Sequence, residues 1–317
     1  MLLGKKSKLV IMIVGPTGVG KTGLAIELSK AIGGEIISAD SRYLYRGMDI
    51  GTSKPSIGER AGIPHYLIDT ADPDDTWSLA VYLEKTVHLV EDIFSKNKVP
   101  IIVGGTGQYV RALKEGWRIP AFETDENLRN ALHNWSEVIG KAEIHHKLSV
   151  IDAEAARIID PSNVRRTIRA LEVIFSTGQR FSTLRVKDGP AYEYWIIGLT
   201  LPREQLFERI DARIDEMFRR GLIQEVKQLL EKGYGPDLPS MSAIGYREVT
   251  RYLNGEIEFE AARDQMRNRT RQFVRRQANW FKPDDKTIHW YSMEKDPIPE
   301  ILKDLSELTR INGQHEC

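Results

Sequence analysis

Short apolar runs and helical repeats alternate along the first third of the chain. The apolar runs have the length of strands and are nearly continuous, which is typical of strands buried on both faces of a parallel sheet. They cover Leu9–Val14, Glu35–Ala39, Tyr66–Asp69 and Pro100–Gly104. Helical spacing lies between them, and the alternation predicts a doubly wound α/β sheet with helices on both faces.

The spacing of apolar residues also predicts which faces of two helices are buried. In the helix that follows the first run, apolar residues recur at Leu24, Leu28, Ala31 and Ile32. A second helix is predicted over Trp77–Asn97, with five residues facing inward: Leu79, Leu83, Val87, Val90 and Phe94.

The pattern changes after Ile119. From there to Pro190 no segment has a convincing strand pattern, and the spacing predicts helices over Glu126–Trp135, Glu137–Leu148, Ala153–Ile159 and Asn163–Thr177. We interpret this region as an all-helical insertion domain, residues 119–191, within an α/β core formed by residues 1–118 and 192–317.

The second part of the core is predicted to contain two strands and two helical regions. Strand patterns occur at Tyr194–Thr200 and Thr287–Tyr291, an amphipathic helical pattern covers Pro202–Gly233, and a long basic helix is predicted over Phe259–Phe281.

Length, composition and cysteine content exclude several classes of protein. The 317 residues suffice for a large domain and a smaller one, and a hydrophobic content of 41% supports a real core. The apolar runs are too short to span a membrane, residues 1–6 lack the apolar stretch of a signal peptide, and a single cysteine, Cys317, excludes disulfide frameworks and cysteine-based zinc sites. We expect a soluble cytoplasmic protein, and nothing in the sequence requires more than a monomer.

The first apolar run leads into a phosphate-binding loop. The sequence "GPTGVGKT" fits the motif G-x-x-x-x-G-K-[ST] and consists of Gly15, Pro16, Thr17, Gly18, Val19, Gly20, Lys21 and Thr22. Its glycines allow a sharp turn in which N–H groups converge on phosphate oxygens, and the following helix N-terminus favours the same anion. Lys21 supplies a positive charge, and the Thr22 hydroxyl is placed to bind Mg²⁺.

The acidic residue that usually accompanies this loop in phosphoryl-transferring proteins is missing from its usual place. There an Asp ends a long apolar strand and holds Mg²⁺. Here the run "PIIVGGTGQY" ends in Gly104, Gly105 and Thr106, whereas Asp40 follows an earlier strand. Asp40 should therefore lie near the phosphates, at the carboxyl edge of the sheet, as a magnesium-associated group, a general base or a helix cap.

Basic residues are concentrated in two places although the net charge of the chain is zero. Residues 263–282 contain seven basic residues and one acid, and four of the arginines repeat every four residues: Arg263, Arg267, Arg271 and Arg275. The segment Arg165–Arg169, near Arg157, forms a second cluster. Such runs are usually solvated faces, but two clusters with few acids nearby favour binding to a polyanion.

Six motifs in order across the chain carry a resemblance to a known family. They are "GPTGVGKT", "ISADSRYLYRGMDIGTSKP", "IIVGGTGQYVRAL", "NVRRTIRALEV", "LPSMSAIGYRE" and "RRQANWFK", and they lie between Leu9 and Lys282. With them the chain closely resembles the tRNA dimethylallyltransferases, the bacterial isopentenyl-tRNA transferases. The resemblance implies a P-loop NTPase-like parallel sheet with flanking helices and a helical insertion that embraces the anticodon stem-loop.

The resemblance also implies a reaction. A dimethylallyl group would pass from dimethylallyl diphosphate to N6 of the adenine that follows the anticodon (A37), in tRNAs that read codons starting with U. The phosphate loop would hold the diphosphate of the donor, with Mg²⁺ on Thr22 and a further positive charge from Arg213. From the residues alone, an exposed Arg213 paired with Asp211 or Asp215 is the simpler interpretation.

Asp40 would act as the base that takes a proton from the adenine amino group, since this amine is a poor nucleophile. Thr106 would orient the amine or the base, although a threonine that only stabilises the turn is equally consistent with the residues.

The family pattern further implies a set of residues that contact tRNA. They are Asp40, Ser41, Arg42, Tyr43, Thr106, Arg129, Arg165, Arg166, Thr167, Ile168, Arg169, Ser242, Ala243, Ile244, Gly245, Tyr246, Arg247, Arg275, Arg276, Gln277, Ala278, Asn279, Trp280, Phe281 and Lys282. Tyr43, Tyr246 and Trp280 are candidates for stacking on bases, although buried aromatic residues are more common. The target adenine would have to be flipped into the site.

Three alternatives are consistent with parts of the sequence. A small-molecule kinase would use the same loop with ATP, but the strand end without a carboxylate and the basic helix argue against it. An adenylate isopentenyltransferase would prenylate free nucleotides and would not need two arginine clusters. A GTPase-like switch would need a guanine-reading N-K-x-D stretch, which the sequence lacks. Eukaryotic relatives often add a C-terminal zinc finger, which a chain with one cysteine cannot form, so a bacterial type is favoured.

Overall fold

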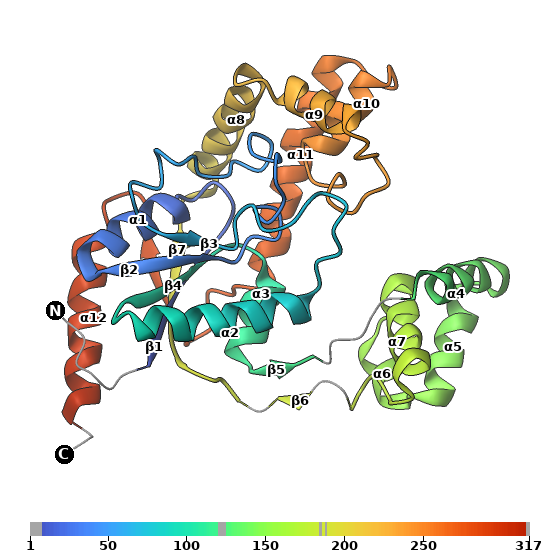
Figure 1. The fold of residues 1–317 in the computed structure, drawn as a ribbon, viewed down its shortest axis with the longest axis horizontal. Coiled ribbons are helices and arrows are strands. Elements are labelled where there is room, and N and C mark those ends of the chain that lie inside the picture. The colour runs from blue at the N-terminus through green and yellow to red at the C-terminus, as the bar shows by residue number, and fades with distance from the viewer. Residues whose placement is uncertain (1–7, 120–124, 184–185, 188, 315–317) are drawn as a thin grey trace. The chain divides into compact units, whose positions relative to one another are not determined.

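The computed structural model describes residues 8–119, 125–183, 186–187 and 189–314. The chain divides into two compact units. We call the first the core unit, which takes residues 1–77, 82–114 and 191–317, and the second the helical unit, which takes residues 78–81 and 115–190. Figure 1 shows the elements of each unit. The predictions for residues 1–6 and for Cys317 lie outside the described residues.

The core unit is built on a parallel sheet of six strands. In chain order these are β1 (Leu9–Val14), β2 (Gly34–Ser38), β3 (His65–Tyr66), β4 (Val99–Val103), β7 (Glu193–Thr200) and β8 (Ile288–Ser292). They lie in the order β3-β2-β4-β1-β7-β8, and every adjacent pair is parallel. The doubly wound α/β prediction is confirmed. Because β1, β2 and β4 are neighbours, the residues that follow them meet at one edge of the sheet.

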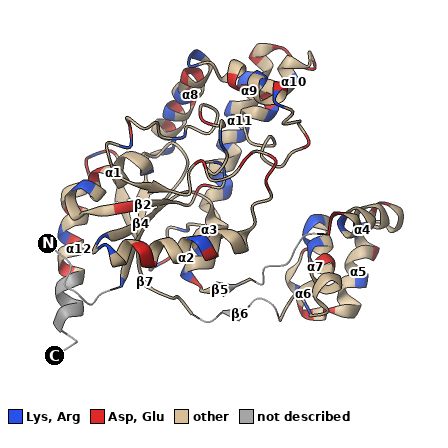
Figure 2. Cartoon of the chain, viewed as in Figure 1, with Lys and Arg blue, Asp and Glu red and all other residues tan. Residues whose placement is uncertain are grey.

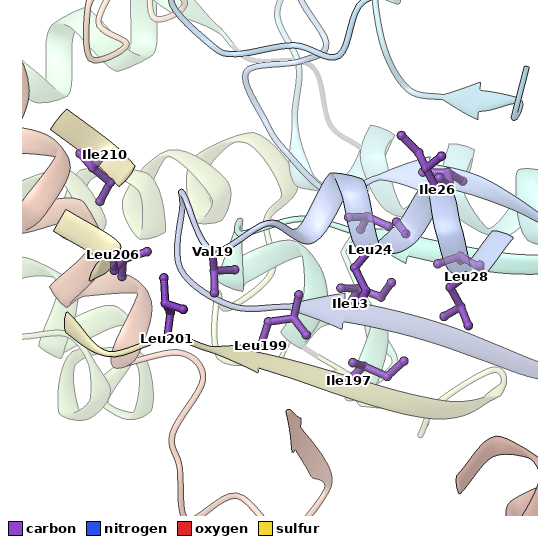
Figure 3. Close-up of a cluster of buried hydrophobic side chains, with 14 of the residues drawn as sticks. Ile13, Val19, Leu24, Ile26, Leu28, Ile197, Leu199, Leu201, Leu206 and Ile210 are labelled. Carbon is purple, nitrogen blue, oxygen red and sulfur yellow. The ribbon is translucent and has the colours of Figure 1, made fainter. Parts of the chain in front are cut away.

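Eight helices of the described chain accompany the sheet. They are α1 (Lys21–Ile32), α2 (Leu79–Ser95), α3 (Gly107–Lys114), α8 (Arg203–Arg219), α9 (Leu222–Glu231), α10 (Tyr246–Leu253), α11 (Phe259–Ala278) and α12 (Ile298–Gln314). In Figure 3, Val19 of the phosphate loop lies among Leu199, Leu201 and Leu206. The loop is therefore fixed by its own buried side chain against β7 and α8.

The buried face of α2 differs from the prediction. Its buried residues are Tyr82, Thr86, Val90 and Ile93, whereas Val87 is 37% exposed. The Tyr82 ring stacks on Tyr109 of α3, with 3.7 Å between the ring centroids. Burial of this large aromatic ring turns the helix away from the orientation that its aliphatic residues alone would favour.

Backbone conformation explains where other predicted elements end early. The region Pro202–Gly233 forms two helices because Gly221, at φ 98°, breaks the regular spiral. The third strand is limited to His65–Tyr66, since Leu67 and Asp69 have φ values of 58° and 54°, which a strand cannot contain. The basic helix ends at Ala278 rather than Phe281.

The helical unit has a core of its own. Its helices are α4 (Glu126–Ile139), α5 (Lys141–Ile151), α6 (Ala153–Ile158) and α7 (Val164–Thr177), and their buried residues include Leu132, Ile144, Leu148, Ala155, Ile168 and Leu171. Asp125, Asp152 and Asn163 accept hydrogen bonds from the first turns of α4, α6 and α7.

The prediction of an all-helical insertion missed one feature of this unit. Strands β5 (Trp117–Arg118) and β6 (Val186–Lys187) form a short antiparallel pair. Just outside this pair, a side chain on Gly116 would collide with the Gly189 carbonyl oxygen, so the two backbones touch. Two residues per strand give too little periodicity for detection from sequence.

No helix within the described ranges is long and apolar enough to cross a membrane.

Candidate functional site

A cavity of about 270 Å³ lies at the sheet edge where β1, β2 and β4 end. Its polar wall includes the phosphate loop, Asp40, Tyr43, Gly105, Arg213 and Gln277. Its apolar wall includes Ala25, Ile36, Ile68, Val103 and Phe273. Residues that are far apart in the sequence therefore meet in one pocket of the core unit.

The phosphate loop presents free donors to this cavity. Within the described chain, the N–H groups of Gly18, Gly20, Lys21 and Thr22 have no hydrogen-bond acceptor. Gly18 and Gly20 have φ values of 84° and 107°, which L side chains rarely adopt. These free N–H groups, at the start of α1, form an anion-binding concavity.

Lys21 is the cation of this loop. Its Nζ donates to the carbonyl oxygens of Gly15, at 3.0 Å, and Pro16, at 2.7 Å. Burial lowers the pKa of Lys21 to about 8, with Asp40 opposing the shift and Arg213 adding to it. An anion bound in the cavity would stabilise the charged lysine, so the site favours a ligand with negative charge.

Arg213 points into the same cavity from α8. Its guanidinium donates to the Thr17 hydroxyl at 2.9 Å, and burial lowers its pKa against the opposing effects of Tyr43 and Asp40. The neighbouring acids on α8 pair elsewhere, Asp211 with Arg271 and Asp215 with Arg267. The interpretation of Arg213 as an exposed arginine paired with these acids is therefore wrong.

Asp40 lies two residues after β2 and reaches the cavity. Its Oδ1 accepts the N–H of Arg42 at 2.9 Å, which caps a turn rather than a helix. The helix-cap alternative is therefore excluded. Within the described chain Oδ2 has no hydrogen-bond donor, so it remains available for a ligand.

The segment after β4 packs directly on the segment that carries Asp40. The Thr106 N–H donates to the Ala39 carbonyl, and the Thr106 hydroxyl oxygen accepts the Ser41 N–H at 3.1 Å. A side chain on Gly104 would collide with the Ala39 carbonyl oxygen. The close approach holds Thr106 beside the acid and leaves its hydroxyl hydrogen free to be donated.

Tyr43 forms a wall of the cavity and is held by an unusual turn. Its hydroxyl donates to the Ser53 carbonyl at 2.9 Å, and Ser53 has a φ of 58°. Next to it the buried Lys54 donates to Tyr45 O, Asp49 and Asp69 at 2.5 to 2.6 Å. Burial and the charge of Asp40 raise the pKa of Tyr43, so its hydroxyl stays protonated near neutral pH.

The basic helix α11 is largely neutralised, contrary to the prediction. Arg263, Arg267, Arg269 and Arg271 pair with Glu260, Asp215, Glu248 and Asp211 at 2.5 to 3.0 Å. Three of these acids lie outside α11, on α8 and α10, so the charge of the helix alone was misleading. Figure 2 shows the basic residues along α11 and the mixed charges of α8. Arg275 and Arg276 are exposed and have no carboxylate partner within the described residues.

A second hollow, a groove of about 590 Å³, runs along one face of α11. Ser242, Ile244, Arg247 and Arg276 were predicted to contact RNA, and they line this groove. Four further lining residues were missed: Gln265, Asn268, Arg269 and Gln272. The spacing of three or four residues between polar positions from Gln265 to Arg276 is a signal that could have identified this face.

Several residues implied to contact tRNA have buried side chains. They are Thr167, Ile168, Ala243, Tyr246, Gln277 and Phe281. Tyr246 is 0% exposed and its hydroxyl donates to Glu225 at 2.6 Å, so it cannot stack on a base. Trp280, by contrast, is 43% exposed. Motifs contain core residues as well as contact residues, which explains these errors.

The helical unit carries its own arginine cluster. Arg165 and Arg166 are exposed at the start of α7. Arg129 and Arg169 both pair with the buried carboxylate of Glu172, at 2.9 Å. The exposed Arg165 and Arg166 are therefore the residues of this cluster that can offer charge to an anion.

Metal binding by protein side chains alone is not supported. Among the residues that the structure describes, no three His, Cys, Asp or Glu side chains come together to hold a metal ion. Thr22 and Asp40 do line the same cavity. One hydroxyl and one carboxylate suit Mg²⁺, which usually takes its other ligands from water and substrate phosphates.

Comparison with known proteins gives consistent relatives. The family model described as IPP transferase matches residues 43–284. The chain is 44% identical over 302 residues to a tRNA dimethylallyltransferase of Thermomicrobium roseum, covering 95% of this chain and 92% of the relative. It is 47% identical over 273 residues to a tRNA dimethylallyltransferase of a Roseiflexus species, covering 86% and 90%.

Solved structures agree with these relatives. A tRNA isopentenylpyrophosphate transferase from Bacillus halodurans is 38% identical with a TM-score of 0.71, over 98% of this chain and 100% of that one. A eukaryotic dimethylallyltransferase studied while acting on tRNA is 31% identical with a TM-score of 0.77, over 90% and 74%.

Proposed function

Because this chain belongs to the IPP transferase family, we propose that it transfers a dimethylallyl group from dimethylallyl diphosphate to N6 of adenine 37 in tRNA and releases diphosphate. The target tRNAs are those that read codons starting with U. The observation that carries the proposal is the pairing, in one cavity, of a phosphate loop with an acid that follows β2. The chain is an enzyme, and its curated relatives are tRNA dimethylallyltransferases.

The phosphate loop stabilises the leaving group in this proposal. Breaking the allylic C–O bond places negative charge on the diphosphate. The free N–H groups of the loop, Lys21 and Arg213 surround the cavity in which that charge develops. Donors that are already in place before the reaction stabilise the transition state more than mobile water does.

Asp40 acts as the base. As the new C–N bond forms, the amine becomes positively charged and must lose a proton. The free Oδ2 of Asp40 accepts this proton, and the Thr106 hydroxyl beside it orients the amine or the acid. The apolar wall formed by Ala25, Ile36, Ile68 and Val103 suits the hydrocarbon part of the donor.

Mg²⁺ belongs to the proposal as a cofactor that the Thr22 hydroxyl would hold, together with water and the diphosphate. When bound, it neutralises charge on the diphosphate oxygens. The residues of this chain supply the remaining positive charge, which explains why Lys21 and Arg213 line the cavity with no salt bridge to any residue that the structure describes.

The tRNA contacts have two parts. In the core unit, the groove along α11 offers Arg247 and Arg276 for phosphates, with Gln265, Asn268 and Gln272 for base edges. In the helical unit, Arg165 and Arg166 offer exposed positive charge to the anticodon stem-loop, with Arg129 and Arg169 beside them. A monomer that acts in the cytoplasm is the form this proposal predicts, since one chain supplies every residue named here.

The test is incubation with dimethylallyl diphosphate, Mg²⁺ and an anticodon stem-loop RNA, followed by mass spectrometry of the RNA. We expect a gain of one five-carbon unit, and no gain when the target adenine is replaced by guanine. Prenylation of AMP but not of the RNA would indicate an adenylate isopentenyltransferase. Phosphate transfer from ATP, without prenylation, would indicate a kinase.

A further inference from the structure

Gln277 is one of the buried residues of the basic helix and carries a polar side chain. It lies near the end of α11 and is 4% exposed. Its carbonyl Oε1 accepts the Thr17 N–H at 2.8 Å, and its Nε2 donates to the Gly105 carbonyl at 3.0 Å. One side-chain amide therefore joins the phosphate loop to the segment that follows β4.

The first of these bonds affects which donors the phosphate loop presents. The Thr17 N–H is occupied by Gln277, and the Thr17 hydroxyl by Arg213. Thr17 is held from α11 and from α8, while the N–H groups of Gly18, Gly20, Lys21 and Thr22 are left free for an anion within the described chain. Without the Gln277 carbonyl, the Thr17 N–H would have to find another acceptor, and Thr17 would lose one of the two side chains that hold it.

The second bond acts on the segment that follows β4, which also lines the cavity. A Cβ on Gly105 would lie 2.2 Å from the Gln277 Nε2, and a Cβ on Gly107 would lie 2.2 Å from the Trp280 ring. The residue between these two glycines is Thr106. The end of α11 thus contacts the backbone on both sides of the threonine that lies beside Asp40.

We infer that Gln277 is a positioning residue, which fixes the phosphate loop and the Gly105–Thr106 segment at the spacing that diphosphate binding and prenyl transfer require. This inference rests on the proposed function. It differs from the tRNA contact that the "RRQANWFK" motif suggests, because the Gln277 side chain is buried and both polar atoms of its amide already bond to the backbone. Its effect should therefore fall on the donor side of the reaction.

The test uses Gln277→Met, which keeps the length of the side chain and removes both hydrogen bonds, together with Gln277→Ala. The matched control is Gln272→Ala, which removes a glutamine side chain from the groove face of the same helix. For each full-length variant, calorimetry measures binding of inorganic pyrophosphate with Mg²⁺ and of the stem-loop RNA. Steady-state kinetics separate kcat from KM for each substrate, and thermal melting checks the fold.

For Gln277→Met we expect pyrophosphate binding at least about tenfold weaker, a raised donor KM, a lower kcat, and RNA affinity within about twofold of wild type. Gln272→Ala should weaken RNA binding and leave pyrophosphate affinity unchanged. Wild-type donor KM and pyrophosphate affinity in Gln277→Met would overturn the inference while the proposed function stands, and so would a loss confined to RNA binding. A wild-type protein that neither binds pyrophosphate nor prenylates RNA would overturn both.

Discussion

The cations of the cavity and the arginines of α11 lie far apart in the sequence and have different kinds of partner. Lys21 donates only to backbone carbonyls, and Arg213 donates to a hydroxyl. Arg267 and Arg271, by contrast, pair with Asp215 and Asp211, the acids two residues to either side of Arg213. A buried cation without a carboxylate partner is unstable until an anion binds, whereas an arginine in an ion pair mainly supports the fold. The kind of partner that each cation has therefore identifies the anion site better than the number of basic residues in a segment does.

The largest effect is expected at Asp40, the acid of the same cavity. Asp40→Ala should lower kcat by about 10²- to 10⁴-fold, since it removes the base. Stem-loop affinity, measured by filter binding, should change little. Asp40→Asn is the matched control for shape, because its amide oxygen can still accept the Arg42 N–H. Normal prenylation by Asp40→Asn would remove Asp40 from the role of base.

Replacing one arginine of the cavity and one ion-paired arginine of α11 with alanine tests the difference between the two groups directly. Arg213→Ala should lower kcat/KM for the donor by about 10²- to 10³-fold, as expected for loss of a preorganised donor to a developing charge. Arg271→Ala should lower the free energy of unfolding by about 1 kcal/mol, since it breaks an ion pair with Asp211, and leave kcat within a few-fold. Urea unfolding and steady-state kinetics measure the two effects. Equal losses of activity in both variants would contradict the distinction.

The pH dependence of diphosphate binding should report Lys21. Because burial lowers the Lys21 pKa to about 8 in the free protein, the lysine is charged below this pH and neutral above it. Bound anion raises the pKa again, so pyrophosphate affinity should fall by up to about tenfold per pH unit as pH rises above about 8. Calorimetry in buffers of different ionisation enthalpy should show uptake of a proton on binding in this range. Lys21→Met should bind weakly at every pH and lack this transition.

The smallest expected effects are on the salt dependence of RNA binding. Stem-loop affinity should fall steeply with added salt, and Arg275→Ala or Arg276→Ala should each reduce the slope of log Kd against log salt by about 1. Arg267→Ala should leave the slope nearly unchanged because Asp215 already neutralises that arginine. A slope reduced equally by all three would show that ion pairing in the free protein does not predict RNA contact.

Strands were predictable where the sequence carries a continuous signal. The runs that became β1 and β4 are apolar throughout because both faces of the sheet are covered, and the centre of β7 is buried in the same way. The end of β3 was not predictable, since it depends on left-handed residues, Leu67 and Asp69, that have no local sequence signature. The buried face of α2 was predicted correctly at Val90 but not at Tyr82, because a tyrosine carries a polar hydroxyl and is a weak signal of burial.

The position of the site was predictable where it follows from the order of the strands along the chain. Asp40 and the phosphate loop each follow a strand, so parallel pairing brings them together. The ion pairs that Asp211 and Asp215 form were not predictable, because the partner arginines lie more than fifty residues away on α11. The two hydrogen bonds of Gln277 were not predictable either, since they form only when the end of α11 packs against two loops.

The place where the chain enters and leaves the helical unit has a consequence for protein engineering. The chain enters that unit through Gly116 and leaves it through Gly189, and at this point the two backbones touch. A short linker could therefore replace the four-helix segment without stretching the remaining chain. The same point of contact would allow the corresponding segment of a relative to be joined there with the residues of the cavity unchanged.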